Sequence, residues 1–218
     1  MAQRPSRKPR KPAPRPASHK AAGSRKARAD SARTDGERLV TALLALLATH
    51  PWQKISMAEI ARAAGLAPAD AVRVHAGKTA VLRAFLKRID DAVLTGPRGD
   101  GSVRDRLFDL LMGRFDALTP HKKAVSALAT DPCAAACLLP HLIAAMSRTL
   151  DRAGARGSGL TSLIRTNGLA LIYANAFRVW LKDDSPDMGA TMAALDRGLQ
   201  RAEALVSACP GRRRTAAA

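Results

Sequence analysis

The sequence predicts an all-α protein with an N-terminal helix-turn-helix domain and a C-terminal helical domain. Hydrophobic residues make up 47% of the 218 residues and aromatic residues only 3%, so Ala and Leu must fill most of the core. Side chains such as these, which are not branched at Cβ, favour closely packed helices over sheets. Apolar residues recur at helical spacing through most of the chain, and no segment shows the alternation of a strand. The third observation is a short stretch, residues 56–66, with the caps and turn of a helix-turn-helix.

The first helix is predicted to begin at Thr34, where Thr34 and Glu37 have the spacing of a capping box. Leu39, Leu43, Leu46 and Leu47 then repeat at helical spacing, and His50-Pro51 ends the helix. Three more helices are predicted, over 56–64, over 68–75, and from Lys78 or Thr79 to about Leu94. We expect these elements to form one domain, residues 34–94.

The second and third of these helices are separated by a tight turn. Ser56 and Glu59 can form a capping box, which predicts the start of the second helix. Gly65 supplies the left-handed residue that ends it. Pro68 then stands where a first helical residue is expected. Ile60, Ala61 and Ala64 are the expected buried stripe, with Ala61 small where the next helix must approach.

A run rich in Gly, residues 95–101, predicts the boundary to a second domain, residues 102–208. Ser102 is expected to cap its first helix, and Thr119-Pro120 to start a short one. A longer helix is expected from Asp131-Pro132 to Gly154, interrupted by Pro140. An apolar helix follows over 160–181. Ser185-Pro186 is expected to cap the last helix, with Asp187 in its first turn and a seam of apolar residues from Met188 to Val206.

The net charge of +18 is concentrated at the ends of the chain. Residues 1–33 hold eleven Lys or Arg and one acidic residue, with almost no large apolar side chain. Such a segment cannot bury enough surface to fold, so we expect a disordered basic arm that contacts DNA phosphates. A solubilising tail and a mitochondrial transit peptide are the alternatives, although the many prolines oppose the latter. Residues 209–218 are expected to form a second disordered tail.

This layout resembles the TetR family of transcriptional regulators. The matching residues lie in the first domain: Leu39 to Leu47, Ile55, Ile60-Ala61, Ala64-Gly65-Leu66, Lys78 and Leu82. The resemblance implies a TetR-like fold with double-stranded DNA as partner. Lys78 takes the place of a family lysine that touches a DNA phosphate. The DNA-binding residues implied are Ser56, Ala67, Pro68, Asp70, Arg73, His75 and Lys78.

The recognition helix departs from the family pattern. Ala67 stands where Ser or Thr is usual, Val72 replaces a phosphate-binding Tyr, and Val74-His75 stand where His and Phe are expected. Residues 34–94 contain eight basic and six acidic residues, a weak excess of positive charge for a domain that reads DNA.

The resemblance to TetR regulators also implies a homodimer formed through residues 160–207. It further implies a small apolar ligand in the C-terminal domain that changes DNA affinity.

The C-terminal half resembles a second group, the COQ9 proteins, which are TetR-shaped, bind isoprenoid lipids and assist ubiquinone biosynthesis. The matching segments are 114–120, 151–154, 165–173 and 181–185. This resemblance offers an alternative function, a lipid-binding accessory protein with a vestigial helix-turn-helix. An architectural protein that binds DNA through its tail alone is a third hypothesis. The ligand-binding residues expected under either of the first two are Phe115, Leu169, Ile172, Tyr173, Phe177 and Trp180, any of which could instead be simple core.

The sequence predicts no enzyme, cofactor or metal site. Cys133, Cys137 and His141 are spaced at i, i+4 and i+8, which puts the outer two about 12 Å apart on a straight helix, too far to share one ion. No Ser/His/Asp or Cys/His constellation is evident. No run of about 18 apolar residues predicts a membrane span. Three cysteines give no disulfide framework, so a cytoplasmic setting is expected.

Overall fold

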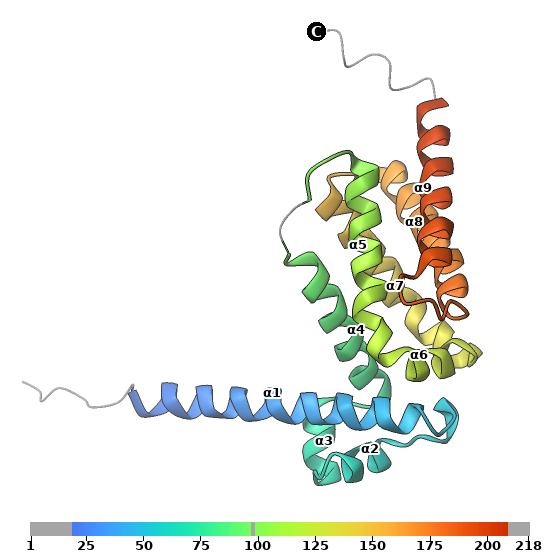
Figure 1. Cartoon of the computed structure of the whole chain (residues 1–218). Coiled ribbons are helices and arrows are strands. Elements are labelled where there is room, and N and C mark those ends of the chain that lie inside the picture. Colours follow the sequence, from blue (N-terminus) through green and yellow to red (C-terminus); the bar gives the residue numbers. More distant parts are fainter. Residues whose placement is uncertain (1–18, 97–98, 209–218) are drawn as a thin grey trace, which may run out of the picture.

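The computed structural model describes residues 19–96 and 99–208, which form nine α-helices and two short 3-10 turns without any strand (Figure 1). The all-α prediction is therefore confirmed for this part of the chain. The helices are α1 (His19–Leu47), α2 (Met57–Ala63), α3 (Pro68–Val74), α4 (Lys78–Leu94), α5 (Val103–Leu118), α6 (Lys122–Ala129), α7 (Pro132–Ala153), α8 (Gly159–Trp180) and α9 (Gly189–Ala208). The 3-10 turns are η1 (Trp52–Lys54) and η2 (Thr119–His121).

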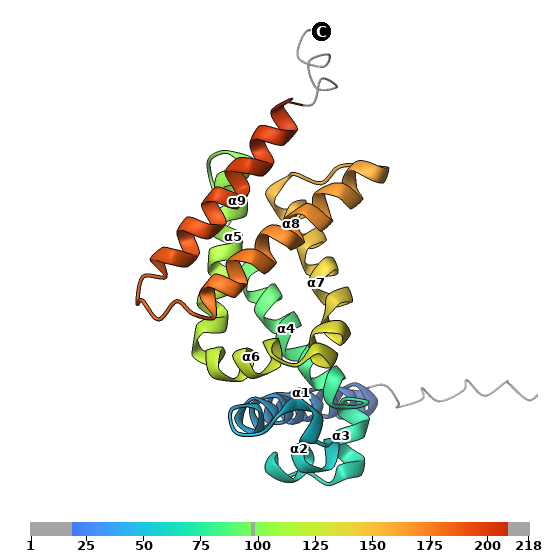
Figure 2. The same cartoon turned by 90° about the vertical axis from the view of Figure 1, so that its right-hand side faces the viewer.

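The helices are arranged with the helix-turn-helix at one end of the molecule. α1 lies across this end with α2 and α3 on its outer side, and α4 leads from there into a bundle made by α5 to α9 (Figure 1). α8 and α9 pack on each other and cover one side of the bundle, which faces the viewer in Figure 2. The α2–α3 unit is therefore the part of the described chain farthest from the end of α9.

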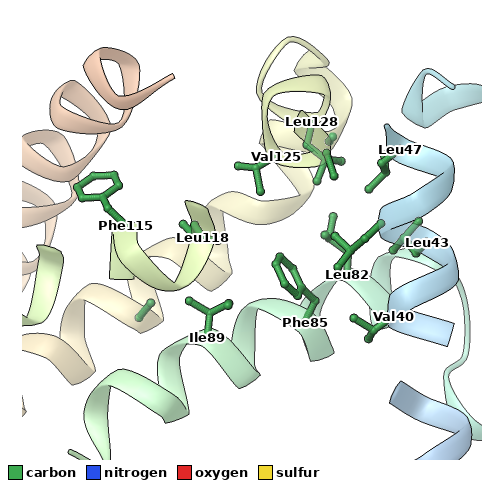
Figure 3. Close-up of a cluster of buried hydrophobic side chains, with 14 of the residues drawn as sticks. Val40, Leu43, Leu47, Leu82, Phe85, Ile89, Phe115, Leu118, Val125 and Leu128 are labelled. Atoms are coloured by element: carbon green, nitrogen blue, oxygen red, sulfur yellow. The ribbon is translucent and has the colours of Figure 1, made fainter. Parts of the chain in front are cut away.

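One apolar core runs from the helix-turn-helix end into the bundle. Val40, Leu43 and Leu47 of α1 meet Leu82 and Phe85 of α4, and side chains of α5 and α6 close the cluster from the other side (Figure 3). The helical structure is interrupted between α4 and α5, at the predicted boundary. The core nevertheless continues across it, because α4 contacts α1 at one end and α5 and α7 at the other.

The start of α1 differs from the prediction. The helix begins at His19, fifteen residues before Thr34. Thr34 lies inside it, and its hydroxyl donates to the Asp30 carbonyl at 3.0 Å instead of capping a helix. The sequence between His19 and Thr34 is rich in Ala, Lys and Arg, which are strong helix formers, and it has no proline. Residues 1–18 of the predicted basic arm and the predicted tail 209–218 lie outside the described residues, as do residues 97–98.

The last helix also begins later than predicted, at Gly189 rather than after Ser185. Asp183 provides the cap, because its Oδ2 accepts hydrogen bonds from the Thr191 amide at 2.8 Å and the Thr191 hydroxyl at 2.7 Å. Its other oxygen accepts from the Ser185 hydroxyl, and these bonds lower the pKa of Asp183. Asp187 lies in the turn before the helix, so its predicted place in the first turn is wrong.

α7 is continuous through Pro140, where an interruption was predicted. The proline removes one hydrogen bond, to the carbonyl of the exposed Ala136, which can be solvated instead. By length and composition alone α7 is long and apolar enough to cross a membrane, as helices in the core of a protein can also be. In this structure it packs against α4, α5, α6 and α8.

Candidate nucleic-acid interface

The predicted capping box at the start of α2 is present. The Ser56 hydroxyl oxygen accepts from the Glu59 amide at 3.2 Å. Glu59 Oε2 in turn accepts from the Ser56 amide at 2.7 Å and the Ser56 hydroxyl at 2.8 Å. These bonds stabilise the carboxylate and lower the pKa of Glu59. Ser56 therefore fixes the start of α2, and its carboxylate partner is held at the exposed surface.

The turn between α2 and α3 is closed as the sequence predicts. Gly65 has φ +66°, and the Leu66 amide donates to the Ala61 carbonyl at 2.9 Å. Arg38 of α1 reaches the turn and donates to the Gly65 carbonyl at 3.2 Å. A Cβ at Gly65 would lie 2.9 Å from the end of the flexible Arg38 side chain, which can move, so it is the positive φ that favours glycine here. Pro68 follows as the first residue of α3, after Ala67, which has no polar side chain to cap it.

The outer face of α3 carries little free charge. Ala71 is fully buried against the other helices, whereas Pro68, Val72 and Arg73 are exposed. Arg73 forms an ion pair with Asp70 one turn earlier, and both side chains face solvent. The one cation of α3 is thus neutralised locally, as expected for an i, i+3 pair.

Lys78, predicted to touch a phosphate, makes internal contacts. Its Nζ donates to the Trp52 carbonyl at 2.7 Å and to the Ile55 carbonyl at 2.9 Å, and it lies 4.5 Å from the centre of the Trp52 ring. Two of its three N–H groups therefore fix η1 and the segment before α2 to the first turn of α4. Only the third remains for a phosphate.

His75 ends α3 and lies in a groove between α1, α3 and α4. The groove has a volume of about 900 Å³ and is lined by basic and acidic side chains, among them Arg33, Arg88 and Glu37. Partial burial lowers the pKa of His75, which favours the neutral form of the ring. Its Nε2 lies 3.4 Å from the place that a Cβ of Gly36 would take, so the ring faces α1.

The predicted ligand residues form packed core. Phe115 is fully buried and its ring lies 5.1 Å from that of Tyr173 and 5.8 Å from that of Trp180, measured between centroids. Phe177 stacks on both Tyr173 and Trp180, and Leu169 is buried nearby along α8. Ile172, half-buried, packs where α9 crosses at Gly198. Four cavities found within residues 19–96 and 99–208 are lined by other side chains.

A buried charge network was not predicted. Asp90 of α4 is only 2% exposed and forms an ion pair with Arg114 of α5. Its Oδ2 lies 2.6 Å from Arg148 Nη2 and 3.2 Å from His141 Nε2, both on α7. Arg114 Nε also donates to the Tyr173 hydroxyl at 3.1 Å, which adds α8. The network therefore joins four helices around one carboxylate.

The imidazole of this network is neutral at pH 7. Burial and the neighbouring guanidinium groups of Arg114, Arg148 and Arg83 lower the pKa of His141 to about 4. Cys133 and Cys137, its predicted neighbours in a metal-like spacing, lie along α7, Cys133 exposed and Cys137 half-buried. Among the described residues no group of three or more His, Cys, Asp or Glu is placed to hold a metal ion.

The same overall fold occurs in solved TetR regulators. A TetR regulator from Nitrosomonas europaea superposes with a TM-score of 0.61 at 19% identity, over 77% of this chain and 97% of that chain. One from Rhodococcus sp. RHA1 gives 0.57 at 19% identity, over 78% and 95%. A TetR-family regulator from Streptomyces coelicolor gives 0.51 at 21% identity, over 78% and 84%. The chain has the TetR fold. No protein-family model and no curated protein matches the sequence.

Proposed function

We propose that this protein is a TetR-like transcriptional regulator that binds double-stranded DNA as a homodimer. The observation that carries the proposal is the helix-turn-helix itself. α2 and α3 are joined by a correctly capped, glycine-closed turn and stand at the end of the molecule, with Val72 and Arg73 of α3 facing outward. This is the placement in which a recognition helix can enter a major groove.

The second copy would pair through α8 and α9. Leu160, Leu163, Ile164 and Leu171 of α8 are 61% to 73% exposed, and their spacing puts them on one side of the helix. Leu205 of α9 adds a further large apolar side chain at 70% exposure. A cluster of exposed large apolar side chains is typical of protein–protein contacts. Two copies paired by a two-fold axis would place two α3 helices for successive major grooves.

The basic N-terminal segment would supply affinity independent of DNA sequence. Lys20, Arg25, Lys26, Arg28 and Arg33 fall within the sequence of α1 ahead of the helix-turn-helix. Because α1 continues as one helix from His19, the segment leaves the folded part of the chain in a fixed direction rather than from a loose joint at Thr34. Each phosphate neutralised by it releases counterions, so binding should weaken steeply with salt.

The test uses the full chain, since a cut at residue 34 would fall inside α1. Fluorescence anisotropy would compare a duplex from upstream of its own gene with a scrambled duplex of equal composition at physiological salt. Arg73→Ala should weaken binding to the upstream duplex by about tenfold and leave the scrambled duplex nearly unaffected. Lys123→Ala, which removes an exposed charge on α6, is the matched control. Equal binding of both duplexes by the unmodified protein would contradict sequence-specific recognition.

The alternative is a lipid-binding protein that has kept the helix-turn-helix without reading DNA. The observation that favours it is that Arg73 and Lys78 are both engaged by other groups of the same chain. Arg73 pairs with Asp70, and Lys78 donates to two backbone carbonyls, so α3 and the start of α4 have little free positive charge. Mass spectrometry of lipid extracted from the purified protein would separate the two functions. A stoichiometric isoprenoid lipid, together with equal binding of both duplexes, would favour the alternative.

A further inference from the structure

The outward side of α3 is apolar apart from one residue. Ala69, Val72 and Arg73 are exposed and stand at spacings of three and four, so they share one side of the helix. Ala71 lies on the opposite side and is fully buried. Val72 is 50% exposed and is the largest apolar side chain of the outward side. The surface that α3 would present to a major groove is therefore formed mainly by alkyl groups.

The polar side chains around this surface are held by other groups of the chain. Asp70 pairs with Arg73. The ring of His75 faces α1. The Ser56 hydroxyl belongs to the capping box of α2, and Lys78 donates to two backbone carbonyls. Of these five residues, only Arg73 is placed for hydrogen-bonded readout of a base edge, so most of the outward side of α3 must read DNA in another way.

The first residues of α3 allow a close approach to the bases. Ala67, Pro68 and Ala69 are all exposed, and all three have short side chains. The N-terminal part of a recognition helix is the part that contacts base edges, so short side chains there let the backbone lie near the floor of the groove. Val72, one turn after Ala69 on the same side, then reaches base edges.

The base feature that fits an exposed valine is the C5-methyl group of thymine. This methyl is the one apolar group in the pattern that base pairs present in the major groove, where the other groups are hydrogen-bond donors or acceptors. Contact of Val72 with a donor or acceptor would remove that group from water without giving it a partner. Contact with the methyl group instead buries apolar surface on both sides.

Val72 stands apart from the apolar surface proposed for dimerisation. The other large apolar side chains exposed in the described part of the chain lie at the start of α5 and on α7, α8 and α9. Protein partners bind contiguous apolar patches, which a lone valine does not provide. On DNA, by contrast, a single methyl contact distinguishes thymine from the other bases. The isolation of Val72 therefore favours a base over a protein as its partner.

We propose that Val72 is a specificity-determining residue that reads the C5-methyl group of a thymine in each half of the DNA site. This inference rests on the proposed function, because it requires α3 to lie in the major groove. Since the two copies of a symmetric dimer make the same contacts, a T·A pair is expected at the same position of both half-sites. Val72 thus adds apolar readout to the hydrogen-bonded readout by Arg73.

Replacement of thymine by deoxyuridine tests the proposal, because the two nucleotides differ in base-edge chemistry only by the methyl group. A preferred site is first selected from random duplexes with the full-length protein. Fluorescence anisotropy then compares this site with copies in which one symmetric pair of thymines at a time is replaced. At the pair read by Val72 we expect about fourfold weaker binding per methyl lost, or about fifteenfold for both half-sites. A selected site in which no replacement weakens binding by more than about twofold would overturn the proposal.

Val72→Ala identifies the residue that makes the contact. In this variant the thymine and deoxyuridine forms of the sensitive position should bind equally, because a double-mutant cycle assigns the coupling to the pair that is changed. Val103→Ala is the matched control, since it shortens a valine of 39% exposure at the start of α5, and it should keep the full difference. Helical circular dichroism checks that both variants are folded. A difference that persists in Val72→Ala would assign the methyl contact to another residue and overturn the proposal.

The same experiment separates this proposal from the proposed function. A selection that yields no preferred sequence contradicts sequence-specific recognition, and reading of thymine by Val72 with it. A preferred sequence whose affinity is the same with deoxyuridine at every position supports the proposed function and overturns only the role of Val72.

Discussion

Replacing Asp90 with Asn removes the one negative charge from a buried network while keeping the size and shape of the side chain. Arg114, itself nearly buried, would lose its ion-pair partner, and Arg148 and His141 would face a neutral amide. The Asn amide can accept hydrogen bonds through its oxygen only, and its NH₂ group would point at donors. The variant therefore leaves a buried guanidinium without a counter-charge.

Breaking a buried ion pair by removing one partner costs about 3–5 kcal/mol in the free energy of unfolding. Asp90 is 2% exposed and meets two guanidinium groups, so the upper part of that range is expected. For a chain of this size a loss of that magnitude lowers the melting temperature by about 6–20 °C. Urea unfolding followed by helical circular dichroism measures the change directly, with the slope m checked for constancy.

Asp91→Asn is the matched control at the next position. Asp91 is exposed and pairs with Lys87 on the helix surface at 2.5 Å, and such exposed pairs contribute about 0–1 kcal/mol. Arg114→Met combined with Asp90→Asn removes both buried charges and should recover much of the loss. If Asp90→Asn costs no more than Asp91→Asn, the reasoning that this network holds α4 to α5 and α7 is refuted.

Two further predictions concern packing and pH. Gly198→Ala should destabilise the fold by about 1–3 kcal/mol, because its Cβ would lie 2.7 Å from Ile172 Cγ2 where α8 and α9 cross. Gly113→Ala should stabilise the fold by about 0.5–1 kcal/mol, because its Cβ would meet only ordinary contacts and alanine favours the helix. Urea unfolding of both variants checks this, and equal effects would contradict it. His141 has a folded pKa of about 4, below its ordinary 6.5, so the unfolded chain takes up this proton first and stability falls as pH drops from about 6.5 towards 4. His141→Gln should reduce the loss measured between pH 7 and 5, and an identical loss in variant and parent would exclude this role of His141.

The helix-turn-helix could be predicted because its signals are local. The capping box of Ser56 and Glu59 spans three residues, and Gly65 and Pro68 mark the turn within a few more. Each of these determines backbone geometry directly, whatever lies elsewhere in the fold. The starts of α5 at Ser102 and α7 at Asp131 were predicted for the same reason, and both side chains act as caps.

The Asp90 network could not be predicted, because its members are far apart in the sequence. Asp90 stands beside Asp91 in the sequence, and its partners come from positions 114, 141 and 148. Position 173 adds the hydroxyl that binds Arg114. Only the crossing of α4 with α5 and α7 brings them together. The predicted starts of α1 and α9 were wrong for another reason, because Thr34 and Ser185 stand in sequences typical of helix caps. In the fold, the Ala- and Lys-rich segment before Thr34 is itself part of α1, and Asp183 accepts the hydrogen bond from the Thr191 amide at the start of α9.

α4 connects the features on which the proposals depend. Along its 17 residues, about 25 Å of helix, Lys78 holds the approach to α2, Phe85 packs between α1 and α6, and Asp90 binds α5 and α7. Val93, near the end of the helix, lies beside α5. A helix with buried contacts along its length moves as a rigid body more readily than it bends. A displacement at Val93 must therefore either break the Asp90 ion pairs or turn α4 about them, and only the turn carries the change to Lys78.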